Sequence, residues 1–150
     1  MKEYNTILVP TDFSPCSDKA LEYGKDLSKR FNAQLHILYV VEPIETFATI
    51  NGVEQSVYID MIREVHTSAT ERMARLQSDL SGFGYNVICN VREGRPSETI
   101  LEYSKANNMS MICLATHGRS GLNHLLLGST TEKILRKAEC PVFVVRATEE

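Results

Sequence analysis

Short apolar runs that alternate with helical patterns constrain the fold of this chain more than any other feature. Near-continuous apolar runs bounded by turn residues are typical of buried strands, and apolar residues that recur every three or four positions are typical of helices. We expect strands over residues 5–9, 34–41, 87–91, 109–115 and 142–145, and helices over residues 15–31, 55–80, 97–107 and 129–137. This alternation predicts a doubly wound parallel α/β sheet with five strands and four helices.

Local signals and chain length support this fold. Ser14 is a residue type that caps helices, and Pro15 follows it at the first helical position, where a missing N–H costs nothing. The period-two alternation over residues 87–91 indicates a less buried strand, which we expect at an edge of the sheet. The chain has 150 residues, of which 43% are hydrophobic, so we expect a single domain over residues 1–150.

A glycine-rich loop is expected between the fourth strand and the last helix, over residues 115–131. Gly118, Gly121 and Gly128 lack a Cβ, so their backbone N–H groups can approach an anion closely. Ser129 and Glu132 have the spacing of a capping box, with Ser129 as the N-cap, and a helix N-terminus favours a phosphate. The alternative is a loop of ordinary turn glycines and a simple serine cap, in which the charge of Glu132 opposes a phosphate.

Two loops are expected at the same end of the sheet. Residues 10–14 follow the first strand and residues 115–128 follow the fourth, so both loops lie at carboxyl ends of parallel strands. Ligands of open α/β sheets bind at such ends, where the strand order reverses. If the two strands are neighbours, both loops face one cleft.

Charge and cysteine pattern exclude several classes of protein. The net charge of -3 and the absence of a basic stripe argue against a nucleic-acid partner. No apolar run reaches the ~18 residues of a membrane helix, and the first residues lack the apolar core of a signal peptide, so we expect a cytoplasmic protein without a membrane partner. The four cysteines form no Cys-x-x-Cys pair, which argues against a zinc site or a disulfide framework.

Several segments together resemble the universal stress protein family. They are Ile-Leu-Val-Pro-Thr-Asp-Phe-Ser (7–14), Thr-His-Gly-Arg-Ser-Gly (116–121), Leu-Gly-Ser (127–129) and Cys-Pro-Val (140–142), and the resemblance spans the whole chain. The ATP-binding signature of that family is Gly, two residues, Gly, nine residues, Gly and then Ser or Thr. Gly118, Gly128 and Ser129 match it, whereas Ala115 stands at the first glycine. The extra methyl group is compatible with phosphate binding, but it takes space from a ribose or phosphate.

The resemblance implies a Rossmann-like fold of the adenine nucleotide alpha hydrolase type. It implies ATP as the ligand, or the related ADP or AMP, with Mg²⁺ carried by the nucleotide. The phosphates and ribose would contact Gly118, Gly128 and Ser129, with Ala115 lining the site. The adenine would lie near the end of the first strand and the second strand, at Pro10, Thr11, Asp12 and Val40.

Other side chains at the expected site are Asp12, His117, Arg119 and Thr130. The carboxylate of Asp12 is the candidate for a polar contact to the nucleoside, and the alternative is that it accepts hydrogen bonds from nearby backbone N–H groups. Arg119 suits a phosphate, or is a solvated loop residue. His117 has no Ser, Cys or carboxylate placed by sequence to complete a triad, so we assign no catalytic residue.

Three functions remain open. The first is a signalling module that binds an adenine nucleotide, responds to stress or energy state and acts with an unknown protein partner. The resemblance implies that it is a homodimer through the strand at residues 142–145. The second is an enzyme, at most a slow ATPase, because the loop at residues 10–14 and the lack of paired carboxylates for Mg²⁺ do not suit rapid transfer chemistry. The third is a universal stress protein that binds no nucleotide and acts through protein partners, which Ala115 favours.

Overall fold

The computed structural model describes residues 3–43, 55–117 and 127–146. The strands and helices bear out the predicted alternation along the chain. The strands are β1 (Thr6–Thr11), β2 (Gln34–Val41), β3 (Val87–Glu93), β4 (Met111–Ala115) and β5 (Val142–Val145). The helices of the described residues are α1 (Pro15–Phe31), α3 (Gln55–Gly82), α4 (Pro96–Ala106) and α5 (Ser129–Lys137).

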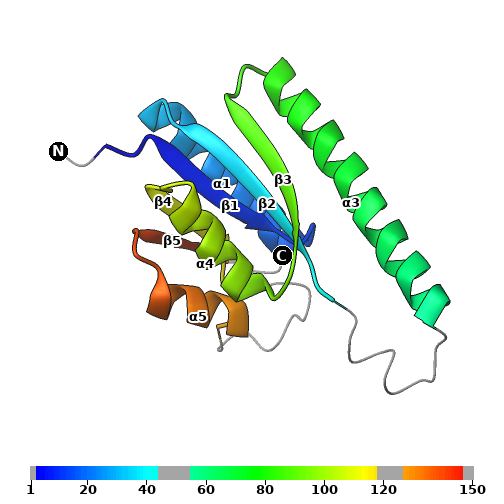
Figure 1. Ribbon diagram of the computed structural model, residues 1–150. Coiled ribbons are helices and arrows are strands. Elements are labelled where there is room, and N and C mark those ends of the chain that lie inside the picture. The colour runs from blue at the N-terminus through cyan, green and yellow to red at the C-terminus, as the bar shows by residue number, and fades with distance from the viewer. Residues whose placement is uncertain (1–2, 44–54, 118–126, 147–150) are drawn as a thin grey trace.

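The strands form one parallel sheet in the order β3-β2-β1-β4-β5. The chain therefore builds the sheet outward from β1 to β3, then returns and continues from β4 to β5 on the other side (Figure 1). The predicted doubly wound fold is confirmed, and β3 lies at an edge as its alternation predicted. Because β1 and β4 are neighbours, the strand order reverses between them.

Two apolar clusters fill the space on the two faces of the sheet. On one face, Ala20 and Leu21 of α1 and Met73 of α3 are buried with residues of the strands. On the other face, Ile100 of α4 and Ile134 of α5 are buried in a second cluster. No helix among the described residues has the length and apolar character that crossing a membrane requires.

The strand boundaries correct the sequence prediction at both loops. Pro10 and Thr11, expected in a loop, are the last residues of β1 and pair with Leu38 and Tyr39 of β2. The fourth strand begins at Met111 rather than at residue 109. The reason is that the N–H of Met109 still donates to the Ser104 carbonyl, 2.9 Å away, which completes the end of α4.

Helix α1 begins and packs as its sequence dictates. The hydroxyl of Ser14 accepts a hydrogen bond from the Ser17 N–H at 3.2 Å, which confirms Ser14 as the N-cap. Gly24, in the middle of the helix, faces β1, and a Cβ at this position would collide with Cγ2 of the fully buried Val9. The missing side chain therefore sets how closely α1 approaches the sheet.

The buried imidazole of His36 connects β2 with β3 and α4. Its Nδ1 lies 2.8 Å from the hydroxyl of Tyr103, and its Nε2 lies 3.0 Å from Oε1 of Gln34. Oε1 of Gln34 can only accept, so Nε2 carries the proton and donates to it. In the neutral ring Nδ1 then accepts from the Tyr103 hydroxyl, which itself accepts from the Asn90 amide at 2.9 Å. This arrangement uses a neutral imidazole, and burial lowers the pKa of His36 below its ordinary value.

Gly24→Ala is expected to lower the free energy of unfolding by about 1–2 kcal/mol, because crowding against Val9 outweighs the better helix propensity of alanine. Gly82→Ala is the matched control, since a Cβ at Gly82 meets no atom within 4 Å. It should leave stability unchanged or raise it by up to about 1 kcal/mol. Urea unfolding of both variants measures the difference, and equal effects would contradict the close approach of α1.

The free energy of unfolding should fall as the pH falls below the ordinary histidine pKa of 6.5. The pKa of His36 is lower in the folded than in the unfolded chain, so the unfolded chain binds the proton more readily in this range. Urea unfolding between about pH 7.5 and 5.5 measures this loss in the wild type. His36→Gln should show a smaller loss, whereas His66→Gln, at an exposed position of α3, should behave as the wild type. An unchanged pH dependence in His36→Gln would contradict the assignment.

Candidate functional site

A cavity of about 110 Å³ lies where the carboxyl ends of β1 and β4 are side by side. Its walls come from the ends of three strands and from the starts of α1, α4 and α5. The residues that line it are Pro10, Thr11, Asp12, Ser17, Leu38, Val40, Pro96, Ile100, Leu114, Ala115, His117, Thr130 and Thr131. The described parts of the two loops that we expected to share a cleft, at Asp12 and His117, therefore border one cavity.

Most of the predicted site residues border this cavity. They are Pro10, Thr11, Asp12, Val40, Ala115, His117 and Thr130. Gly128 and Ser129 lie at the start of α5, next to Thr130 but not in the cavity wall. Gly118 and Arg119 lie outside the described residues.

The start of α5 corrects the predicted capping box. The N-cap is Gly128, and Ser129 is the first residue of the helix and makes no cap. Glu132 does not return to the helix start, because its carboxylate accepts two hydrogen bonds from Arg136, one turn further on, at 2.8 and 3.1 Å. The N–H of Gly128 instead donates to the Thr116 carbonyl at 2.8 Å. This bond joins the residue before α5 to the residue after β4.

Thr131 is a residue of the site that the sequence analysis missed. Its side chain is buried, and its hydroxyl donates to the carbonyl of Ala115 at 2.9 Å. This bond fixes the first turn of α5 on the end of β4. The signal was present in the helical spacing, because Thr131 lies three residues before the fully buried Ile134 and so belongs to the inner face of α5.

Asp12 shapes the loop between β1 and α1. Its Oδ1 accepts a hydrogen bond from the Ser14 N–H at 3.0 Å. This is the alternative role that the sequence analysis gave for Asp12, a carboxylate that accepts hydrogen bonds from nearby backbone N–H groups. One residue on, the N–H of Phe13 donates to the Thr11 hydroxyl at 3.0 Å, and Phe13 has a left-handed backbone with φ of 59°. These two bonds hold the half-buried Asp12 at the cavity wall.

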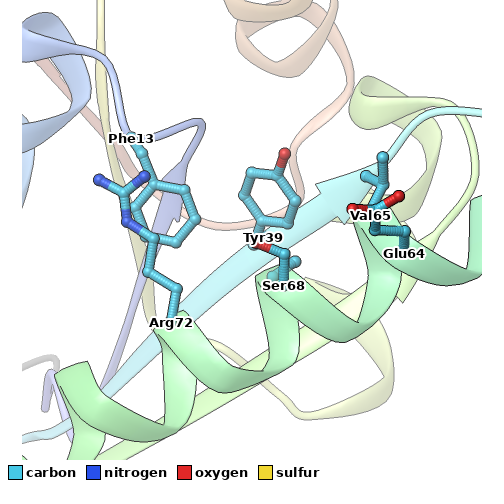
Figure 2. A pocket seen from close by; sticks show the side chains of 7 residues that line it. Phe13, Tyr39, Glu64, Val65, Ser68 and Arg72 are labelled. Atoms are coloured by element: carbon cyan, nitrogen blue, oxygen red, sulfur yellow. The ribbon is translucent and has the colours of Figure 1, made fainter. Parts of the chain in front are cut away.

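A second cavity, of about 380 Å³, lies on the opposite face of the sheet beside α3 (Figure 2). The guanidinium of Arg72 lies over the ring of Phe13, 3.8 Å from the ring centroid. Phe13 in turn stacks on Tyr39 with ring centroids 4.9 Å apart. Because Phe13 follows Asp12 directly, this stack ties α3 to the loop that borders the first cavity.

The family of the chain follows from a match over nearly its whole length. The family model described as "Universal stress protein family" matches residues 3–146. The chain belongs to the universal stress protein family. This universal stress protein is 36% identical over 148 residues to universal stress protein A homolog 2 of Coxiella burnetii, and the match covers 97% of each chain.

Solved structures of the family have the same fold. Protein MJ0577, a universal stress protein of Methanocaldococcus jannaschii, matches with a TM-score of 0.85 and 26% identity, over 99% of this chain and all of that one. A universal stress protein family protein of Arabidopsis thaliana with AMP bound matches with a TM-score of 0.67 and 15% identity, over 96% and 92% of the two chains. A universal stress protein in complex with cAMP matches with a TM-score of 0.67 and 19% identity, over 98% and 100%. At these lower identities the likeness concerns the fold alone.

Proposed function

We propose that this universal stress protein binds an adenine nucleotide, ATP or the related ADP or AMP, at the ends of β1 and β4. One observation carries the proposal: a single cavity is bordered by residues from three distant segments of the chain, each of which the family resemblance assigns to the nucleotide. These are Asp12 after β1, Val40 in β2, and Ala115 at the end of β4, and His117 lines the cavity beside them. The structures with bound AMP and cAMP, which share this fold, support the choice of ligand.

The base is the part of the nucleotide that suits the cavity. Leu38, Val40, Ile100 and Leu114 provide apolar walls, and the volume of about 110 Å³ fits a planar base better than a whole nucleotide. The ribose would then lie at the mouth of the cavity. Its hydroxyls are suited to donate to the carboxylate of Asp12, which lies at that wall.

The phosphates suit the start of α5. The first intrahelical hydrogen bond there runs from the Glu132 N–H to the Gly128 carbonyl, so the N–H groups of Ser129 and Thr130 precede the regular helical bonding. The positive end of the helix dipole adds to their attraction for an anion. Among residues 3–43, 55–117 and 127–146, no group of three His, Cys, Asp or Glu side chains suits a metal ion. We therefore propose that Mg²⁺ arrives with the phosphates.

The proposed role is regulatory, with nucleotide occupancy sensed by a protein partner. A homodimer through β5 belongs to this proposal. Residues Val142–Val145 form the edge of the sheet, and Phe143 on this strand is 38% exposed. Pairing of the two β5 strands would satisfy their outer backbone groups and cover this ring.

Ala115 is the observation that favours a universal stress protein without nucleotide, because its methyl group takes space at the cavity wall.

Val40→Phe should weaken the binding of Mg-ATP by at least about tenfold, because the larger ring fills the space proposed for the base. Leu101→Phe is the control, since Leu101 packs against the same apolar cluster but does not line the cavity. It should bind within about threefold of the wild type. Calorimetric titration of both variants, with folding checked by circular dichroism, measures the effect. Wild-type affinity in a folded Val40→Phe protein would place the nucleotide elsewhere.

A further inference from the structure

The outer edge of β3 borders a groove beneath α3. The groove has a volume of about 540 Å³ and lies on the opposite side of α3 from the aromatic stack of Phe13. Thr70, Ala74 and Ser78 line it from α3 with small side chains, and Cys89 and Val91 line it from β3. Figure 1 shows β3 at the edge of the sheet with α3 running alongside it. We call this space the α3–β3 groove.

Alternate backbone groups of β3 point out of the sheet toward this groove. The Leu35 N–H of β2 donates to the Asn86 carbonyl at 2.8 Å, and the Gly94 N–H donates to the Val41 carbonyl at 3.0 Å. In a parallel ladder with this register, the even-numbered residues of β3 bond to β2. The N–H and carbonyl groups of Val87, Cys89, Val91 and Glu93 therefore face outward.

Two side chains already occupy outward positions of this edge. Oε1 of Gln77, from α3, accepts a hydrogen bond from the Cys89 N–H at 2.7 Å. Nη1 of Arg92 donates to the Val91 carbonyl at 3.4 Å. Gln77 thus provides the acceptor, and Arg92 the donor, that the main chain of a sixth strand would provide. Both are flexible side chains that a main-chain partner can displace.

We propose that the α3–β3 groove binds an extended, uncharged segment of a partner protein as a sixth strand of the sheet. A main-chain carbonyl of that segment takes the place of the Gln77 side chain at the Cys89 N–H. Strand addition to a sheet edge is a common mode of peptide recognition, in which main-chain bonds give affinity and alternate side chains give specificity.

The lining of the groove determines the chemistry of the segment. The described lining holds no Asp, Glu, Lys or Arg and one histidine, His66, so it suits an uncharged segment better than a charged one. The small side chains of Thr70, Ala74 and Ser78 leave room for β-branched residues. A second copy of this chain is a weaker candidate, because its own Gln77 and Arg92 occupy the same edge and both pairs would have to be displaced.

The first test uses the whole protein without nucleotide and the peptide acetyl-Thr-Val-Thr-Val-Thr-Val-amide. Residue-resolved hydrogen exchange should show slower exchange of the Val87 and Val91 amides when the peptide is added, and no change in the β5 amides. The control is the same peptide N-methylated at every residue, which keeps the side chains but removes the N–H donors from both edges of the peptide. No protection by the unmodified peptide, or equal protection by the methylated one, would overturn the proposal.

The second test uses Gln77→Ala, with Ser68→Ala as the control, because Ser68 is on the same helix but does not line the groove. Removing the amide frees the Cys89 N–H, so Gln77→Ala should bind the peptide about threefold or more tightly than the wild type. Ser68→Ala should bind as the wild type. Weaker or unchanged binding by a folded Gln77→Ala protein would contradict displacement of this side chain. If Gln77→Ala self-associates as its concentration rises but does not bind the peptide, the groove belongs to a second copy of this chain. That result would overturn the proposal that the groove binds a segment of a partner protein.

Discussion

The pairing of β1 with β4 is the constraint on which the rest of this structure depends. It joins two segments about a hundred residues apart, and a cluster of polar bonds fixes its register at the start of both strands. The Thr6 N–H donates to the Ser110 hydroxyl at 2.9 Å, and the Ser110 hydroxyl donates to the Thr6 carbonyl at 2.6 Å. Because this pairing places the ends of β1 and β4 next to each other, it creates the point where the strand order reverses and the cavity opens.

The other elements position side chains around that point. The Thr131 hydroxyl on the Ala115 carbonyl fixes the start of α5, and Asp12 on the Ser14 N–H fixes the turn into α1. On the opposite face, Arg72 and Phe13 connect the same turn to α3. A ligand at the cavity would therefore contact a turn that is also in contact with α3, which provides a physical route by which occupancy affects that helix.

Elements with strong local signals were predictable from the sequence. Ser14 and Pro15 gave the start of α1, and the apolar run of β2 gave its bounds. The predicted capping box at Ser129 failed because a residue pattern does not specify the backbone path, and the N-cap is Gly128. Pro10 and Thr11 were placed in a loop because their residue types are typical of turns, whereas pairing with β2 keeps them in the strand.

The wall of the cavity was predictable to the extent that the family signature marks it. Asp12, Val40 and Ala115 follow from that signature and from the ends of the strands. Ser17 does not, since a small hydroxyl residue in a helix is usually exposed and its burial depends on packing, and for Thr131 the sequence gives only the helical spacing to Ile134. The α3–β3 groove could not be predicted from the sequence either. The alternation of β3 predicts an edge strand, but the position of Gln77 over Cys89 depends on how α3 packs.

The most direct test of the central claim is the identification of any nucleotide that the protein carries. Freshly purified protein that has never been dialysed would be denatured, and the released small molecules identified and quantified by mass spectrometry. An adenine nucleotide in near-stoichiometric amount is the expected result, because the cavity and the start of α5 together suit a base and its phosphates. The absence of any nucleotide, followed by no binding when Mg-ATP is titrated into the protein, would contradict the account.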